Sequence, residues 1–197
     1  MNPLKTLIVI PAAILWTCFF LAMNADAVPE TTLFDFHSAS KEPGWQVVND
    51  DVMGGVSASR FQVSTNGCAI FSGNVSLENN GGFASVRSGP VGGDLRGLGV
   101  LIIRVRGDGQ RYKCSVRTGS GFDAPFYQCS FLTKRDEWEE HRLAFKDFVP
   151  TYRGRVLTSV PPLDPAKIAS VGFLIADKQS GPFRLEIGWI KAAPAQP

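Results

Sequence analysis

The densest group of side chains that could do chemistry lies at residues 45–57, where the sequence reads WQVVNDDVMGGVS. Asp50 and Asp51 supply the carboxylate oxygens that Ca²⁺ prefers. Adjacent side chains on an extended chain point to opposite sides, so one ion could bind both only if the chain turned there. The alternative is a turn in which both aspartates accept backbone hydrogen bonds while Gly54 and Gly55 adopt positive φ. The sequence favours this turn.

A second group lies at residues 81–87, which read GGFASVR. Paired glycines suggest a loop that binds phosphate, but the spacing matches no established phosphate motif and no helix is expected to follow. A hairpin turn that enters a strand is the better interpretation. Arg87 interrupts a small and apolar stretch, and its guanidinium could bind a carboxylate, either from the Asp50–Asp51 turn or from a ligand.

The sequence gives little support to catalysis. A serine hydrolase needs a nucleophile, a base and an orienting acid, yet the chain has two histidines and no GxSxG motif. A glycosidase needs two carboxylates across a cleft. Asp51, Asp123, Glu140 and Asp177 are candidates, but their spacing defines no pair. We therefore expect no enzyme, and we identify no metal ligands and no cofactor motif.

Two cysteines are candidates for a disulfide. Residues 111–117 and 126–132 have the pattern of two hairpin arms, and the centre near Gly121 is equidistant from Cys114 and Cys129. Cross-strand neighbours can have the Cβ spacing that a disulfide needs. The alternative is a pair of small buried hydrophobic side chains. The sequence leaves both possibilities open.

The elements that must position these residues are strands. Apolar and other residues alternate with a period of two, and clusters of glycine and asparagine separate the runs. This pattern predicts an all-β fold, a jelly-roll sandwich of antiparallel strands. Strands are expected at residues 33–36, 45–48, 59–64, 69–77, 83–88, 101–106, 111–117, 126–132, 138–145, 171–176 and 183–190. Short helical turns are expected at 146–148 and 164–167, with a long surface loop at 151–162.

Length and charge set the broad class. The chain has 197 residues and a net charge of +2, which suits one domain and excludes a strongly basic nucleic-acid binder.

Residues 6–23 carry no charge and precede Ala-Asp-Ala, a small-x-small cleavage site. The pattern predicts a signal peptide over 1–27, a domain over 28–192 and a flexible tail over 193–197. The protein would then be exported, either periplasmic or secreted. The alternative is an uncleaved membrane anchor, which would be the chain's one contact with a membrane.

Three segments resemble the CIA30 family, the relatives of complex I intermediate-associated protein 30. They are residues 45–57, residues 81–87, and residues 172–190 with the string GPFRLEIGWI, and they occur in the family's order. The resemblance covers nearly all of residues 31–192. It implies a galactose-binding-like jelly roll, in agreement with the strand pattern. It also implies a non-enzymatic role, because mitochondrial members act as assembly factors for NADH:ubiquinone oxidoreductase.

The motif residues shared with the family form the candidate binding site. They are Asp50, Asp51, Met53, Gly54, Gly55, Ser57, Gly82 and Arg87. We expect the Asp50 turn and the Arg87 strand to lie close together at one end of the sandwich, because the loops of sandwiches gather there. The alternative is that these residues only stabilise the fold. The expected partner is a protein, with membrane-complex subunits among the candidates. The second functional hypothesis is a carbohydrate-binding module with a glycan as its ligand.

Overall fold

The computed structural model describes residues 29–37, 44–119 and 126–195. The expected signal peptide over residues 1–27 and the centre of the predicted hairpin near Gly121 lie outside these ranges. Within them, no helix has both the length and the apolar character needed to cross a membrane. Strands dominate the described chain, and every pairing between named strands is antiparallel.

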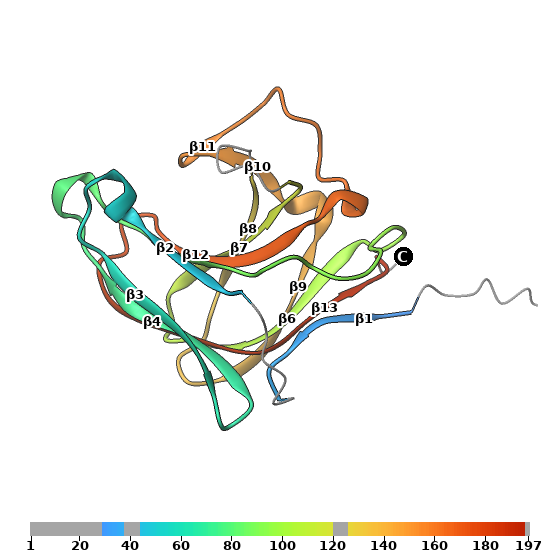
Figure 1. Ribbon diagram of the computed structural model, residues 1–197, viewed down its shortest axis with the longest axis horizontal. Helices are drawn as coiled ribbons and strands as arrows, with labels where there is room; N and C mark the ends of the chain where they lie inside the picture. Colours follow the sequence, from blue (N-terminus) through green and yellow to red (C-terminus); the bar gives the residue numbers. More distant parts are fainter. Residues whose placement is uncertain (1–28, 38–43, 120–125, 196–197) are drawn as a thin grey trace, which may run out of the picture.

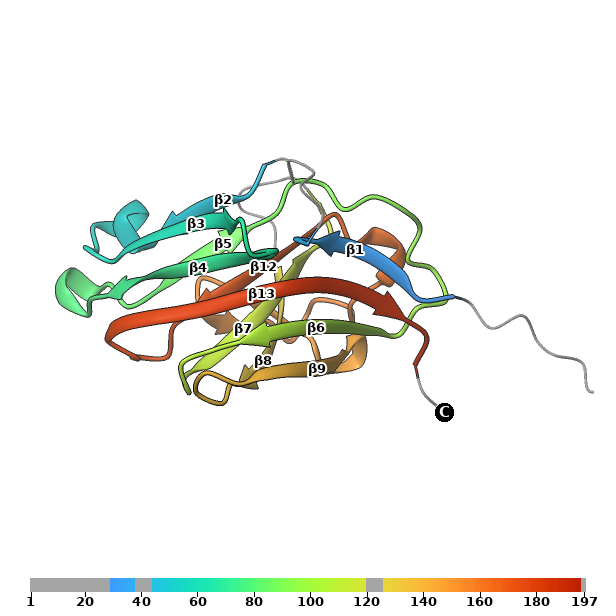
Figure 2. The same ribbon diagram turned by 90° about the horizontal axis from the view of Figure 1, so that it is seen from below.

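One sheet has six strands, in the order β3-β4-β13-β6-β9, with β1 also paired to β13. Their bounds are β1 Thr31–Asp35, β3 Ala58–Ser64, β4 Cys68–Val75, β6 Val100–Arg106, β9 Trp138–Ala144 and β13 Gly181–Ala193. Figure 2 shows β13 as a long strand that runs alongside β4, β6 and β1. β4 pairs with the first half of β13 and β1 with the second half, while β6 pairs along its other edge. The last strand in the chain is therefore the central strand of its sheet.

The second sheet has seven strands, in the order β11-β10-β8-β7-β12-β5-β2. Their bounds are β2 Gln46–Asn49, β5 Ala84–Arg87, β7 Arg111–Arg117, β8 Phe126–Leu132, β10 Val149–Tyr152, β11 Arg155–Val156 and β12 Ser170–Ile175. The two sheets lie face to face, as Figure 1 shows. Four short 3-10 helices complete the described chain: η1 Asp50–Met53, η2 Glu78–Asn80, η3 Phe145–Asp147 and η4 Pro165–Lys167.

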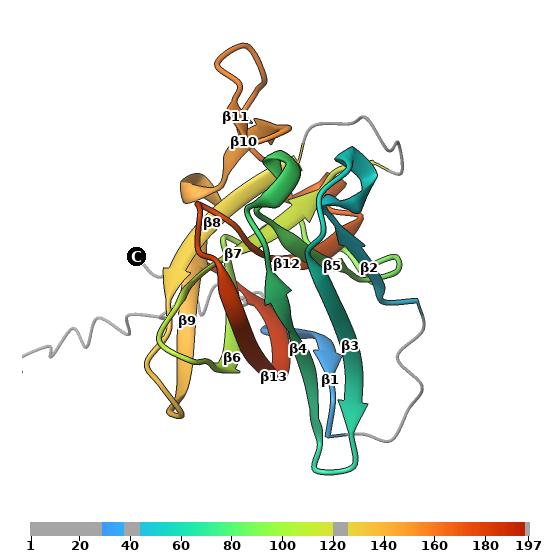
Figure 3. The same cartoon turned by 90° about the vertical axis from the view of Figure 1, so that its left-hand side faces the viewer.

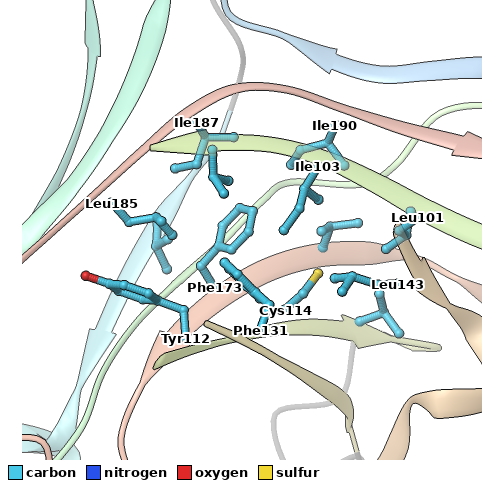
Figure 4. Close-up of a cluster of buried hydrophobic side chains, with 14 of the residues drawn as sticks. Leu101, Ile103, Tyr112, Cys114, Phe131, Leu143, Phe173, Leu185, Ile187 and Ile190 are labelled. Atoms are coloured by element: carbon cyan, nitrogen blue, oxygen red, sulfur yellow. The ribbon is translucent and has the colours of Figure 1, made fainter. Parts of the chain in front are cut away.

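The core fills the space between the sheets because alternate side chains of each strand point inward. Ile103 of β6 and Ile187 of β13 come from one sheet, and Tyr112 of β7 and Phe173 of β12 come from the other. All four are fully buried, and Figure 4 shows them in one cluster. Their burial provides the main stabilisation that holds the two layers together.

Two stretches differ from the sequence-based expectation. Residues 151–162 do not form one long loop, because they contain the end of β10 and all of β11, which pair as a hairpin. Arg153 and Gly154 both have positive φ, 47° and 76°, and two such residues make the tight turn that suits a hairpin. β13 continues through Ala193, one residue into the predicted tail, because Ala193 pairs with Val100 of β6.

Cys114 and Cys129 are directly opposite each other on β7 and β8, as the hairpin pattern predicted. Both are free thiols in the structure, as is Cys68. Burial raises the pKa of the Cys114 thiol, and the neighbouring Cys129 raises it further. In the structure the two thiols are therefore cross-strand neighbours, with Cys114 buried and Cys129 partly exposed.

Candidate functional site

The carboxylate of Asp50 ties together two segments of the candidate site. Asp50 is fully buried at the start of η1. Its Oδ1 accepts a hydrogen bond from the N–H of Ser57 at 2.9 Å, and its Oδ2 accepts one from the Ser57 hydroxyl at 2.6 Å. The same Oδ2 accepts from the N–H of Gly82 at 2.6 Å and from that of Phe83 at 3.2 Å. We call this arrangement of Asp50, Ser57, Gly82 and Phe83 the Asp50 knot.

The Asp50 knot stabilises the charged form of its carboxylate. Burial alone would raise the pKa of Asp50, but the hydrogen bonds from Ser57, Gly82 and Phe83 lower the pKa below its ordinary value. A buried carboxylate with four donors is a satisfied structural group. In the described ranges, no group of three or more His, Cys, Asp or Glu side chains is placed to hold a metal ion. Through its bonds from the backbone N–H groups of Ser57, Gly82 and Phe83, Asp50 has the turn-forming role that the sequence suggested.

The glycines of the turn have two different roles. Gly54 has φ of 89° and donates its N–H to the carbonyl of Asp51 at 3.0 Å, so it ends η1 in a conformation that favours glycine. Gly55 does not have the positive φ that the sequence suggested. It is required for space, because a Cβ at Gly55 would lie 2.4 Å from Cγ of Asp50. Gly81 is also required for space, because a Cβ at Gly81 would lie 2.6 Å from Oδ2 of Asp50.

Three residues between Asp50 and Ser57 expose apolar side chains. Val52 and Met53 are each 58 % exposed and Val56 is 51 % exposed. Leu77 is 44 % exposed and lies close to Gly82 of the Asp50 knot, since a Cβ at Gly82 would lie 3.1 Å from Cδ2 of Leu77. η1 and η2 lie side by side in Figures 1 and 3. We call Val52, Met53, Val56 and Leu77 the η1 tip.

Arg87 is not part of the Asp50 knot. β5 begins beside the knot, where Ala84 pairs with Asn49, and Arg87 lies at its far end, opposite Gln46. Three residues of strand separate the two ends by about 10 Å. Asp50 is already satisfied by uncharged donors, and the described residues contain no carboxylate that forms an ion pair with Arg87. The structure thus joins the two motif segments at Gly82, but it does not bring Arg87 to Asp50.

Other cations lie near Arg87 on the outer face of the seven-stranded sheet, and the sequence analysis missed them. Gly172 of β12 pairs with both Arg87 of β5 and Ser115 of β7, so these three residues form one row across the sheet. Arg117 is two residues beyond Ser115 and therefore on the same face. The signal was present in residues 111–117, where Arg, Lys, Ser and Arg alternate with the buried Tyr112, Cys114 and Val116.

The outer face of the six-stranded sheet carries a different charged cluster, which the sequence analysis also missed. Glu186 is 5 % exposed and accepts hydrogen bonds from Arg106 at 2.6 Å and from Arg184 at 2.9 Å. Burial would raise the pKa of Glu186, but these two arginines lower it. Arg104 and Arg106 also lie over the ring of Trp138, at 5.6 and 5.2 Å. The charges of this cluster are largely paired within the fold.

A hollow of about 330 Å³ lies at the β10–β11 hairpin and is lined by Tyr152, Arg153 and Arg155. None of these residues belongs to the predicted site, and none is a carboxylate, cysteine or histidine. Figure 1 shows the hairpin and η1 as separate features of the fold, on either side of β12 and β7. Among the described residues, the lining of the hollow therefore contains no acid–base pair.

Comparison with known proteins identifies relatives of this chain. The family model for complex I intermediate-associated protein 30 (CIA30) matches residues 34–187. The mitochondrial protein of that name from Mus musculus is 31 % identical over 166 residues, which cover 74 % of this chain and 51 % of the relative. The protein of the same name from Drosophila melanogaster is 25 % identical over 180 residues, which cover 80 % of this chain and 61 % of the relative. This chain thus spans about half the length of the mouse relative.

Among solved structures, a family 11 carbohydrate-binding module from a cellulosomal cellulase of Clostridium thermocellum superimposes with a TM-score of 0.63. The two sequences are 18 % identical, and the superposition covers 86 % of this chain and 96 % of the carbohydrate-binding module. At this identity the match shows the fold alone. It confirms the predicted galactose-binding-like jelly roll of antiparallel strands. The predicted localisation, periplasmic or secreted, is wrong, because the curated relatives are mitochondrial proteins.

Proposed function

This chain belongs to the CIA30 family, and from that membership we propose that it is a non-catalytic, assembly-factor-like module that binds a protein partner. The relatives are named for their association with an intermediate of complex I. We therefore propose a subunit of complex I, or of an intermediate in its assembly, as the partner.

The observation that carries the proposal is the η1 tip on the Asp50 knot. A buried carboxylate with four donors fixes the turn, and the same turn exposes Val52, Met53 and Val56 to solvent. Apolar side chains that gather on a surface commonly mark a site of protein association. A fixed turn also loses little conformational freedom when it binds. The arrangement supports docking of the η1 tip on an apolar surface of a partner.

The test is capture of complex I subunits by the tagged chain from detergent-solubilised membranes that contain complex I. We expect Met53→Asp to reduce the captured subunits at least several-fold, because it places a charge in the proposed interface. Val156→Asp is the matched control, since Val156 on β11 is 64 % exposed and lies outside the η1 tip. Equal capture by both variants, or no captured complex I subunit with the unsubstituted chain, would contradict the proposal.

Carbohydrate binding is the second candidate, and the likeness to a carbohydrate-binding module is what favours it. Sugar sites usually present aromatic rings to the ligand. In the part of the chain that the structure describes, the exposed large hydrophobic residues include one aromatic, Trp138 at 38 %. Retention on immobilised glycans that is lost in Trp138→Ala would support this function.

A further inference from the structure

The charges around the η1 tip all have one sign. The two segments that form the tip, residues 49–57 and 76–83, contain the carboxylates of Asp50, Asp51 and Glu78 and no lysine or arginine. Asp50 is buried, and its hydrogen bonds keep its pKa below the ordinary value, so it is charged at neutral pH. The whole chain has a net charge of +2. The η1 tip therefore combines exposed apolar side chains with a local excess of negative charge.

Asp51 and Glu78 are the carboxylates of this region that a partner can reach. Both residues are exposed, and each is the direct neighbour in sequence of a residue of the η1 tip, Val52 or Leu77. Among the residues that the structure describes, neither carboxylate forms an ion pair. Both are therefore available to pair with cations of another molecule.

Hydrogen bonds hold the two exposed carboxylates on one support. The Ser57 hydroxyl, which donates to Asp50 in the knot, also accepts a hydrogen bond from the N–H of Ser76 at 3.0 Å. The Ser76 hydroxyl in turn accepts one from the N–H of Glu78 at 3.2 Å. Figure 3 shows η1 and η2 side by side at one end of the sandwich. A partner therefore meets the apolar and the acidic side chains together, on backbone that is already ordered.

We propose that the η1 tip binds an amphipathic segment of the protein partner, in which an apolar stripe is flanked by lysine or arginine side chains. The inference rests on the proposed function, because it names the chemistry of the partner at the same site. Val52, Met53 and Val56 would contact the apolar stripe, while Asp51 and Glu78 would pair with the flanking cations. An acidic segment with the same apolar stripe would be repelled, so the charges add specificity.

The same charges argue against a lipid surface as the occupant. Turns and helices that enter the bilayer interface usually carry lysine or arginine beside their apolar side chains, because membrane surfaces are anionic. The two segments of the tip carry carboxylates and no such cation. The observations thus favour a protein segment, and lipid binding is an outcome that the experiment can detect.

The experiment measures fluorescence anisotropy of labelled amphipathic peptides with the full chain. The probe peptide has a leucine stripe flanked by lysines. A Leu/Glu peptide keeps the stripe and reverses the charge, and a Ser/Lys peptide keeps the charge and removes the stripe. We expect the Leu/Lys peptide to bind at least about tenfold more tightly than either of the others. The preference for lysine over glutamate should shrink as salt is added, because exposed charges are screened.

Substitution of the two carboxylates tests their part in this preference. Asp51→Asn combined with Glu78→Gln should weaken binding of the Leu/Lys peptide by about tenfold, the effect expected for losing two exposed ion pairs. The matched control is Asp136→Asn combined with Glu137→Gln. These residues are also an exposed Asp and Glu, but they precede β9, at the opposite edge of the six-stranded sheet from β3. The control should change binding by less than about twofold.

A charge reversal guards against loss of folding as the explanation. Asp51→Lys combined with Glu78→Lys should reverse the preference, so that the Leu/Glu peptide binds more tightly than the Leu/Lys peptide. Loss of folding cannot produce such a reversal. Three outcomes would overturn the inference: equal binding of the Leu/Lys and Leu/Glu peptides, equal weakening by the two double substitutions, or binding to phosphatidylcholine vesicles with no preference among the peptides.

The capture experiment separates this inference from the proposed function. If Met53→Asp reduces capture of complex I subunits while the Leu/Lys and Leu/Glu peptides bind equally, only the chemistry inferred for the partner segment is wrong. If the peptides behave as expected but no complex I subunit is captured, the proposed partner is wrong and the preference of the η1 tip for a basic amphipathic segment stands.

Discussion

At the scale of single residues, Asp50 and Asp51 show how neighbours of the same type can differ. Asp50 is fully buried with four donors, while Asp51 is exposed. Hydrogen bonds to a buried charge each contribute more than those to a neutral group. Asp50 is therefore expected to stabilise the fold strongly, and Asp51 hardly at all.

We predict that Asp50→Asn lowers the free energy of unfolding by about 2–4 kcal/mol, because the amide nitrogen cannot accept the bonds that a carboxylate oxygen accepts. Asp51→Asn should change it by less than about 0.5 kcal/mol. Urea denaturation of both variants measures the difference. Equal stability of the two variants would show that the Asp50 knot is not stabilising.

The contribution of Asp50 depends on pH, with a sign set by its lowered pKa. A lowered pKa in the folded state means that the stabilisation is full above the ordinary value of 3.8 and is lost as pH falls through the folded value. The stability difference between the unsubstituted chain and Asp50→Asn should therefore be constant near neutral pH and shrink below about pH 4. A difference that grows on acidification would contradict this.

A further residue-scale prediction concerns the cysteines. Because Cys114 and Cys129 are free thiols, both should react fully with iodoacetamide after unfolding without reductant. In the folded chain, Cys114 should react more slowly than Cys129, since Cys114 is fully buried and Cys129 is partly exposed. Peptide mass spectrometry measures both. A Cys114–Cys129 linked peptide from freshly purified protein would show a disulfide instead.

At the scale of elements, the Asp50 knot makes η1 and the 81–83 segment one unit. Asp50 begins the 3-10 helix η1, whereas residues 81–83 belong to no helix or strand, so the two are joined by bonds to one carboxylate and not by a strand ladder. The geometry of the η1 tip therefore depends on Gly82 and Phe83, which are about 30 residues away in the sequence.

We predict that Gly55→Ala destabilises the chain by about 1–3 kcal/mol, because the new Cβ would overlap Asp50. Gly92→Ala is the control, since a Cβ there meets nothing within 4 Å and Gly92 lacks positive φ. It should change stability by less than about 0.5 kcal/mol. Thermal unfolding followed by circular dichroism compares the two. A neutral Gly55→Ala would mean that the turn can shift.

The sequence predicted most strands because their period of two is local information. It also predicted η4, because Asp164 before Pro165 is an N-cap pattern. In the structure, the Asp164 carboxylate accepts a hydrogen bond from the N–H of Ala166 at 3.0 Å. It missed the β10–β11 hairpin because Arg153, which is not a typical residue for positive φ, occupies the turn. It could not place Arg87 and Ser115 in one row across the sheet, because the register between β5, β12 and β7 depends on long-range pairing.

At the scale of the whole molecule, two sheets share one core. Phe173 is fully buried and contacts rings on both sides, Trp45 at 6.5 Å and Phe131 at 6.4 Å. Trp45 in turn stacks on Phe61 of the six-stranded sheet at 4.6 Å. This series of aromatic rings couples the two layers.

We predict that Phe173→Ala lowers the free energy of unfolding by about 3–5 kcal/mol, the usual cost of removing a buried ring. Phe173→Leu should cost less, because it leaves a smaller cavity. Near-UV and far-UV circular dichroism should show one coincident transition in urea. Separate transitions would indicate that the sheets unfold independently.

The place of β13 at the centre of its sheet has a consequence for synthesis of the protein. β13 leaves the ribosome after every other strand of both sheets, yet β1, β4 and β6 all need it as their neighbour. Until residue 181 has emerged, a nascent chain therefore presents β4 and β6 with open edges that can pair with other chains. Translation that stops early yields a chain prone to aggregate, and folding of the six-stranded sheet is completed only after translation has passed its last strand.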